Sequence, residues 1–343
     1  MPSNSDSAIA DREFCDAMLP QVSRTFALCI RLLPPELEYP VLIAYLLCRI
    51  ADTIEDTADL PGGDKARLLA AFRATLEDPR ADAAALETAF GQPRNPEERL
   101  AESAIRVLRE FRHLDPNVQA AIRPWVQEMC DGMAEFSERA DEPAGRLASL
   151  STVADLERYC YYVAGTVGHM LTELFRLGPP AYSPERSQKL EQLSTSFGLG
   201  LQLTNIIKDV ADDRRRGWSF VPQELCQVAG IRPDQLHSPA VSDEAHHVMQ
   251  QLIDKAHGHL EDALEYCTTL PRSAYRVRLF CLTSMFFAVR TLALARKDDR
   301  LLDPGHKVKI NRGQVYRTLG LSALCAPSNA LIRAYFSHLG RAA

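Results

Sequence analysis

Apolar residues along the chain recur mostly three and four positions apart, the spacing that places them on one face of a helix. Strand-like alternation is scarce, and breaks such as LPGGD and LGPPAYSPE separate the periodic stretches. The pattern therefore predicts an all-α fold. The expected long helices cover residues 36–57, 97–113, 116–139, 152–177, 184–216, 243–268 and 272–297.

Nothing in the pattern marks a domain boundary. The polar start, residues 1–8, is expected to be disordered. The rest of the chain carries no composition shift and no short repeat, so residues 9–343 are expected to form a single all-α domain. Hydrophobic residues make up 46% of the 343 positions, which is enough for a large core.

Charge and cysteine usage narrow the class of protein. The net charge is -6, and no basic stripe suggests nucleic acid as a partner. The nine cysteines include no CxxC pair and indicate reduced core thiols in a cytoplasmic protein. The start is no signal peptide, and the longest apolar run, Val41 to Cys48, is too short to span a membrane. An apolar substrate could still bring the protein to the inner membrane face, as a peripheral contact that also serves product release.

A first acidic cluster ends an otherwise apolar helix. Asp52, Glu55 and Asp56 are spaced three and four apart, so they share a helix face, and Arg49 lies on the same side. This spacing alone is weak evidence, because acidic pairs four apart also arise by chance. A solvated helix end and a metal site are both open at this point.

A second cluster strengthens the metal reading. Asn205, Asp209 and Asp213 are each four apart on a helix that is otherwise apolar, and Gln202 and Asp212 flank them. Burying such a stripe costs several kcal/mol unless it is compensated. Two such helices could face each other and share magnesium ions, which take hard oxygen ligands and bridge carboxylates to phosphate oxygens. A diphosphate is the natural partner for that chemistry.

Basic residues would complete a diphosphate clamp. The candidates are Arg24, Arg49, Lys208 and the run from Arg214 to Arg216. Ordinary salt bridges to the same acids are the alternative for each of them.

Four stretches in order resemble the squalene/phytoene synthase family. They are SRTFALCIRLLP, YLLCRIADTIEDT, YCYYVAGTVGHMLTELF and GLGLQLTNIIKDVADDRRRGWSFVPQEL, within the span from Ser23 to Leu225. The resemblance implies the isoprenoid-synthase helical fold, with a central cavity between two aspartate-rich helices. It also implies head-to-head condensation of two prenyl diphosphates.

Two further stretches resemble the squalene synthase branch of this family, in a soluble bacterial-type form without a C-terminal membrane anchor. They are FCLTSMFFAVRTL at 280–292 and HKVKINRGQV at 306–315. The second is associated with the reductive step and implies an NADPH site. Its candidate residues are Lys307, Lys309, Asn311 and Arg312. A solvated basic loop before a helix is the alternative.

The resemblance implies an enzyme that joins two farnesyl diphosphates into presqualene diphosphate and reduces this with NADPH to squalene, a sterol or hopanoid precursor. Asp52, Asp56, Asp209 and Asp213 would hold Mg²⁺, with Glu55 and Asn205 as further ligands. Tyr159 matches the family tyrosine assigned to proton handling. Substrate-binding residues would be Ser23, Arg24, Phe26, Tyr45, Arg49, Val163, Val167, Gln202, Lys208 and Phe280.

Several alternatives stay open. The cavity-wall candidates could be plain core packing, and Gly165 with Gly168 could admit either a substrate chain or a neighbouring helix. Family members often carry a basic residue where this chain has Trp218, and the preceding arginines could substitute for it. A phytoene- or dehydrosqualene-type synthase, or a presqualene diphosphate synthase, would lack the reductive step. A di-iron carboxylate bundle and a non-catalytic helical binding protein are rivals from other classes.

Overall fold

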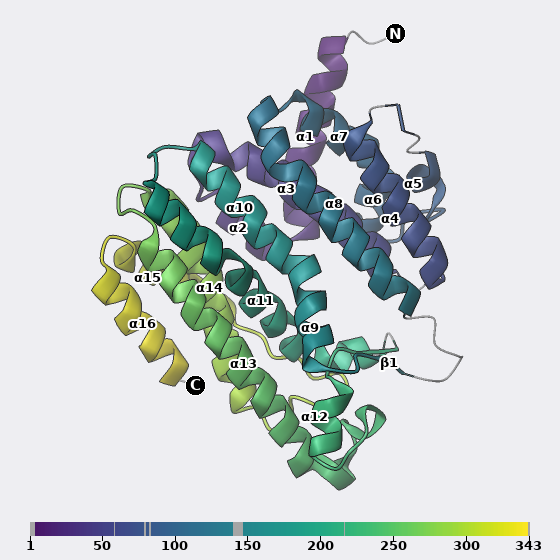
Figure 1. The fold of residues 1–343 in the computed structure, drawn as a ribbon, viewed down its shortest axis with the longest axis vertical. Helices are drawn as coiled ribbons and strands as arrows, with labels where there is room; N and C mark the ends of the chain where they lie inside the picture. The colour runs from purple at the N-terminus through teal and green to yellow at the C-terminus, as the bar shows by residue number, and fades with distance from the viewer. Residues whose placement is uncertain are drawn as a thin grey trace. The chain divides into compact units, whose positions relative to one another are not determined.

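The computed structural model describes residues 4–57, 59–78, 80–81, 84–139, 147–215 and 217–341. Regular structure in these ranges is almost entirely helical, and the all-α prediction is confirmed (Figure 1). The described strands are one short parallel pair, β1 (Ala148–Ser149) with β2 (Trp218–Ser219).

The chain divides into two compact units by the contacts within it. The first unit comprises Met1–Arg139 and His169–Ala181, and the second comprises Ala140–Gly168 and Tyr182–Ala343. The prediction of one domain over residues 9–343, with a central cavity, stays a prediction.

The first unit is built around helix α3 (Pro35–Asp56), the helix that carries the first acidic cluster. Leu42, Leu46 and Ile50 on α3 are fully buried. The helices that pack on it are α1 (Asn4–Val22), α2 (Arg24–Ile30), α4 (Gly62–Glu77), α6 (Pro96–Glu102), α7 (Ala104–His113) and α8 (Pro116–Arg139). The short helix α5 (Ala84–Thr88) lies against α4 and α6.

Two expectations for the first unit are corrected. Helix α1 begins at Asn4, so residues 4–8 are helical rather than disordered, while residues 1–3 lie outside the described part of the chain. The later turns of α1 are anchored by buried Cys15 and Leu19, which supports helix propagation toward the start. The expected helix 97–113 is divided at Ser103, whose ψ of 17° leaves the helical range between α6 and α7.

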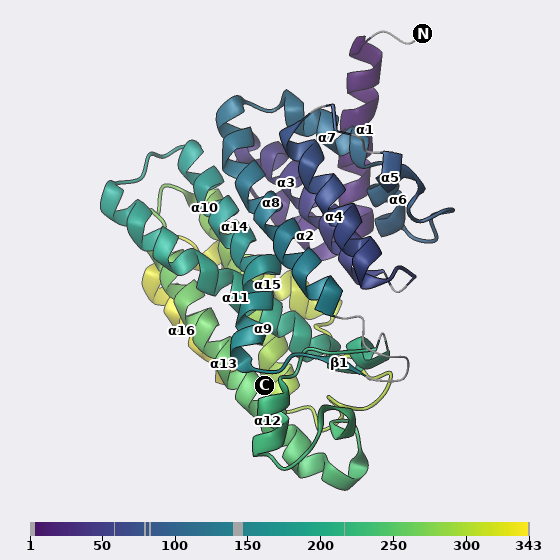
Figure 2. The same cartoon turned by 45° about the vertical axis from the view of Figure 1, so that its right-hand side comes forward.

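The second unit is built around α11 (Pro184–Arg215), which carries the second acidic cluster and runs beside α13 (Ser242–Thr269) and α14 (Tyr275–Arg296) (Figures 1 and 2). Its ends are where the sequence predicts them: Ser183 Oγ accepts from Arg186 N at 3.3 Å, and Gly217 follows with a φ of +85°.

The remaining elements are α9 (Val153–Cys160), a π-helical turn (Tyr161–Gly165), α10 (Thr166–Leu177), α12 (Gln223–Val228), the 3-10 turns Pro233–Gln235 and Pro239–Val241, α15 (Arg312–Cys325) and α16 (Asn329–Arg341). Of α10, only the residues through Gly168 belong to this unit.

Glycines let the π-helical turn and the start of α10 approach α11 backbone to backbone. A Cβ on Gly168 would lie 2.1 Å from the Ser194 carbonyl oxygen, and one on Gly198 would lie 2.1 Å from the Ala164 carbonyl oxygen. The sequence left open whether Gly165 and Gly168 admit a substrate chain or a neighbouring helix. The structure shows a neighbouring helix.

Helix α14 is the one described helix that is long and apolar enough to cross a membrane by length and composition. However, 89% of its most apolar window is buried inside the protein, as in the core helix of a folded domain.

The described cysteines are all free, and all except the partly exposed Cys48 are buried, which confirms the prediction of core thiols. Burial raises the pKa of the Cys48 thiol to about 12.

Gly198→Ala should lower the free energy of unfolding by about 1–3 kcal/mol, because the new methyl group meets a backbone carbonyl that cannot swing away. Gly258→Ala on α13 is the matched control, since nothing lies within 4 Å of its Cβ position. There the gain in helix propensity should raise stability by up to about 1 kcal/mol. Thermal unfolding of both variants measures the difference, and equal melting temperatures would contradict the close backbone contact.

Candidate functional site

In the first unit, the predicted residues form a connected chain of contacts on α2 and α3. The rings of Phe26 and Tyr45 lie 5.6 Å apart between centroids at a tilt of 35°. Arg49 Nη2 donates to the Tyr45 hydroxyl at 3.1 Å, and Arg49 Nη1 donates to Asp52 Oδ2. Because Tyr45, Arg49 and Asp52 are four and three residues apart on one helix, an aromatic ring, a cation and a carboxylate lie next to one another on its surface.

Arg49 is the electrostatic centre of this chain. The Asp52 carboxylate raises the pKa of the Arg49 guanidinium, with smaller contributions from Tyr45 and Asp56, and this outweighs burial, which lowers it. The Arg49 Nε atom is buried and has no hydrogen-bond partner among the described residues. A buried donor without an acceptor costs free energy, so this atom is a candidate donor to the oxygen of a bound group.

The three carboxylates of the first cluster are not equivalent. The Asp52 side chain is 34% exposed, Asp56 is exposed, and Glu55 is buried at 7%. Lys65 at the start of α4, which the sequence analysis missed, donates to the Glu55 backbone carbonyl at 2.6 Å. The burial of Glu55 separates it from the two aspartates, although its part as a ligand stays a prediction.

Two predicted substrate residues lie at the start of α2. Ser23 is its N-cap, and its Oγ accepts from Phe26 N at 3.1 Å. Arg24 is exposed. The structure thus gives Ser23 a capping role and leaves Arg24 accessible, and substrate contact by either residue stays a prediction.

In the second unit, the acidic face of α11 reaches solvent at its C-terminal half. Asn205 is exposed, and Gln202 and Asp213 are partly exposed, while the apolar residues between them are buried. Lys208 forms an ion pair with Asp209, whose side chain is 37% exposed. As at Arg49 and Asp52, a neighbouring cation neutralises the leading aspartate of the motif.

The positions and chemical types of the predicted ligands show whether they suit a metal ion. Among the described residues, no three or more His, Cys, Asp or Glu side chains gather closely enough to hold an ion. The types do fit magnesium, because Asp52 with Asp56, and Asp209 with Asp213, are carboxylates four apart on one helix. Each pair would supply one or two oxygens, with the remaining ligands coming from water or substrate.

Asp212 connects α11 to the C-terminal loop. Its carboxylate, 13% exposed, forms ion pairs with Lys307 and with Arg215. Burial raises the pKa of Asp212, but the hydrogen bonds from Lys307 and Arg215 outweigh it, and the net pKa is lowered. Lys307, predicted to contact a nicotinamide cofactor, is therefore engaged in tying the loop to the second acidic motif.

The other predicted cofactor residues differ in their accessibility. Asn311 is the N-cap of α15: its Oδ1 accepts from Gln314 N at 2.9 Å, and Gln314 Oε1 accepts from Asn311 N at 2.8 Å. Lys309 and Arg312 are exposed and form no ion pair with a described residue. These two are the accessible cations of the loop.

Tyr159 lies in an aromatic stack. It is 5% exposed, and its ring stacks on Phe220 with centroids 4.7 Å apart. Phe220 stacks in turn on Trp218, at 5.3 Å and 10° between planes. The parallel pairing of Ala148 with Trp218 fixes this segment beside α9. The sequence singled out Trp218 only as a departure from the family pattern and missed its contact.

The remaining wall candidates are distributed over helices of the second unit. Val163 lies in the π-helical turn and Val167 in α10, both partly exposed, while Phe280 on α14 is 4% exposed. A π turn inserts one extra residue per turn and is common at functional sites. Phe280 is equally consistent with plain core packing.

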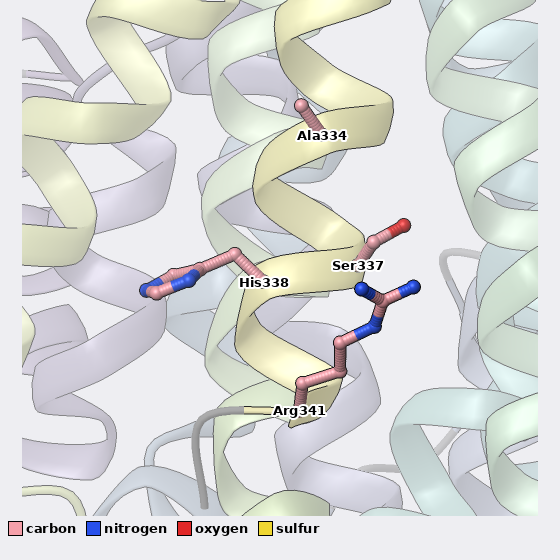
Figure 3. Close-up of a pocket in the computed structure, with 4 residues that line it drawn as sticks. All are labelled: Ala334, Ser337, His338 and Arg341. Carbon is pink, nitrogen blue, oxygen red and sulfur yellow. The ribbon is translucent and has the colours of Figure 1, made fainter.

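Two other features of the second unit lie apart from the predicted residues. A hollow on the surface of α16 is lined by Ala334, Ser337, His338 and Arg341 (Figure 3). A polar cluster joins α11 to α13, where Ser196 Oγ donates to Asp262 Oδ2 at 2.6 Å and lies 2.7 Å from His259 Nδ1. The serine bridges the other two groups, so the histidine does not stand between serine and aspartate as a nucleophilic triad requires.

Comparisons with known proteins identify the family of this chain. The model of the squalene/phytoene synthase family matches residues 19–314. The squalene synthase of Eremothecium gossypii is 33% identical over 91% of this chain and 68% of its own length. The squalene synthase of Homo sapiens is 30% identical over 97% of this chain and 75% of its own length.

Solved structures show the same fold. The complex of TcSQS with the ligand BPH1237 superposes with a TM-score of 0.82 and 28% identity, covering 96% of this chain and 91% of that one. A dehydrosqualene synthase in complex with a ligand covers 97% of this chain and 98% of its own, with a TM-score of 0.66 and 22% identity. The second likeness concerns the fold alone.

Asp212→Asn should free the C-terminal loop, because it removes the charge that holds Lys307 and Arg215. We expect trypsin to cleave after Lys309 several-fold faster than in the unchanged protein, with mass spectrometry as the readout. Asp212→Glu is the matched control, since it keeps the charge and should keep most of the protection. Equal cleavage rates in all three proteins would show that the ion pair does not restrain the loop.

Proposed function

Because the chain belongs to the squalene/phytoene synthase family, we propose that it is a squalene synthase. In this proposal it condenses two molecules of farnesyl diphosphate through presqualene diphosphate and reduces the intermediate with NADPH to squalene. The observation that carries the proposal is that both acidic helices keep carboxylates at i,i+4 spacing, with a cation already paired to the leading aspartate of each.

The first task of the chain is to bind and release a diphosphate. Arg49, whose Nε has no partner among the described residues, and Lys208 are the donors for diphosphate oxygens, because both are fixed beside an aspartate on a rigid helix. Asp52, Asp56, Asp209 and Asp213 would hold Mg²⁺, which supplies the positive charge that offsets the negative charge of the leaving diphosphate. Gln202 and Asn205 lie on the same face of α11 and would orient the waters or the phosphate oxygens.

Tyr159 is the candidate for proton transfer. Its ring is held by Phe220 and is almost completely buried, so water has little access to it. The released diphosphate is a strong base nearby, and a phenol positioned between it and the substrate carbon can relay the proton lost in ring closure. The stack fixes the ring, so the hydroxyl would act from one position.

Apolar and aromatic groups protect the cationic intermediates of such a reaction. Phe26 and Tyr45 form one tilted aromatic pair, and Val163 and Val167 are partly exposed apolar groups. Aromatic faces stabilise cations, and dry walls keep water from quenching them. These residues would line the path of the prenyl chains.

The reductive half of the proposal depends on the C-terminal loop. NADPH would supply the hydride. Lys309 and Arg312 are the accessible cations for its phosphate groups, whereas Lys307 is engaged by Asp212 and Asn311 caps α15. This assigns cofactor contact to two of the four predicted residues and loop positioning to the other two.

Incubating the protein with farnesyl diphosphate and magnesium, with and without NADPH, tests the function directly. We expect extracted squalene only when NADPH is present, as measured by gas chromatography with mass spectrometry. Dehydrosqualene or presqualene diphosphate in both conditions would assign the protein to the non-reductive alternative. Absence of any prenyl product would refute the enzyme proposal itself.

Asp52→Asn and Asp209→Asn should each reduce kcat/KM for farnesyl diphosphate by roughly a hundredfold or more, because each removes a carboxylate that would hold the ion stabilising the leaving group by several kcal/mol. Both side chains are about one-third exposed, so circular dichroism and thermal unfolding should show an intact fold. Asp243→Asn on α13 is the control at an exposed acid and should leave kcat/KM unchanged. Rates near the unchanged level in both test variants would sink the metal-site assignment.

A further inference from the structure

The charge of the chain is unevenly distributed toward its C-terminal end. The whole chain has a net charge of -6, yet residues 304–343 contain no Asp or Glu. The Lys and Arg residues of this segment are Lys307, Lys309, Arg312, Arg317, Arg333 and Arg341. Two of these residues are neutralised by acids from elsewhere, Lys307 by Asp212 and Arg333 by Glu265. The others make this segment a basic surface on an acidic protein.

Helix α15 presents apolar side chains to solvent within that segment. Tyr316 is 72% exposed and Leu324 is 69% exposed, and Gly320 lies between them at i+4. Their spacing places the three on one helix face, with exposed Arg312 and Arg317 on its two sides. We call these five residues the α15 stripe. Large apolar side chains this exposed and this close to cations are a feature of interaction surfaces.

The C-terminal end of the helix that bears the stripe is fixed in place by hydrogen bonds from α14. Arg278 on α14 is fully buried, and it donates to the carbonyl oxygens of Leu270 at 2.6 Å and Ala326 at 2.8 Å and to Asn329 Oδ1 at 2.7 Å. The Tyr275 hydroxyl donates to the Ala323 carbonyl at 3.1 Å. The exposure of the stripe therefore belongs to a braced helix and not to a frayed end.

We propose that the α15 stripe is a docking surface for an anionic lipid bilayer. A tyrosine and a leucine on one helix face can enter the boundary between headgroups and acyl chains, while flanking arginines meet lipid phosphates. The acid-free segment around the stripe removes the repulsion that the rest of the chain would feel near an anionic surface. This goes beyond the proposed function and requires no turnover.

A second copy of the chain is a poorer occupant of the same surface. In a twofold-symmetric dimer each patch faces its own copy, so Arg312 and Arg317 would approach the same arginines of the partner. No described acid in residues 304–341 is available to offset that repulsion. The charge of the stripe is complementary to phosphate, not to itself.

Flotation of the purified full chain with vesicles tests the proposal. Vesicles of phosphatidylcholine with phosphatidylglycerol should carry the protein upward, and vesicles of phosphatidylcholine alone should not. Raising the salt from about 0.1 M to about 1 M shortens the Debye length from about 10 Å to about 3 Å and should release the protein. Equal binding to both vesicle types, or none to either, would overturn the proposal.

Variants locate the surface. Tyr316→Asp with Leu324→Asp should abolish flotation, and Arg317→Ala should weaken binding roughly fivefold, which corresponds to about 1 kcal/mol per basic residue. Arg317→Lys should bind as the unchanged protein does. Val228→Asp on α12 is the matched control, because Val228 is 81% exposed but lies outside the acid-free segment.

The outcomes separate the surface from the enzyme. Consumption of dispersed farnesyl diphosphate, measured without NADPH, should be the same in the Tyr316→Asp, Leu324→Asp variant, so loss of flotation with retained consumption supports a docking role. Loss of flotation in the Val228→Asp control as well would refute the assignment to α15. Sedimentation velocity showing a dimer that the α15 variant dissociates would replace the bilayer by a second copy.

Discussion

The second unit depends on two stretches of backbone that touch without side chains between them. Gly168 lies against the Ser194 carbonyl and Gly198 against the Ala164 carbonyl, so the segment after Tyr159 is seated directly on α11. A Cβ at either position would lie 2.1 Å from a carbonyl oxygen, so any larger residue would push the two segments apart. Because Tyr159 lies one turn or so before this contact and Asp209 three turns after it, the glycines set how the aromatic stack and the acidic face are disposed within the unit.

Both acidic motifs solve the same electrostatic problem in the same way. A carboxylate on an apolar helix needs a partner, and the chain supplies one locally: Arg49 for Asp52, and Lys208 for Asp209. These pairs are partly exposed, so little would be lost if the cation turned to a phosphate oxygen and the carboxylate to a metal ion, as the proposed function requires. The more buried Asp212 has a different role, since it binds two cations and connects the C-terminal loop to α11.

What the sequence could predict follows from the range of the interactions. Helix existence, the Ser183 cap and the Gly217 stop depend on local chemistry and were confirmed, as were the all-α class and the family. The start of α1 and the break at Ser103 were missed, because they depend on packing between distant segments. The same holds for the site: helical spacing placed Asp52 near Arg49, but only the fold pairs Lys307 with Asp212 across 95 positions of sequence.

Trp218 departs from the residue type that the family resemblance led us to expect, and it makes aromatic contacts instead. The family resemblance led us to expect a basic residue at this position, whereas here an indole stacks on Phe220, whose ring stacks in turn on Tyr159. Of the arginines that precede it, Arg215 is paired with Asp212 and is therefore engaged elsewhere. Position 218 therefore contributes aromatic surface to this stack. The cations for diphosphate would then come from Arg49 and Lys208, the two that the helices already hold beside an aspartate.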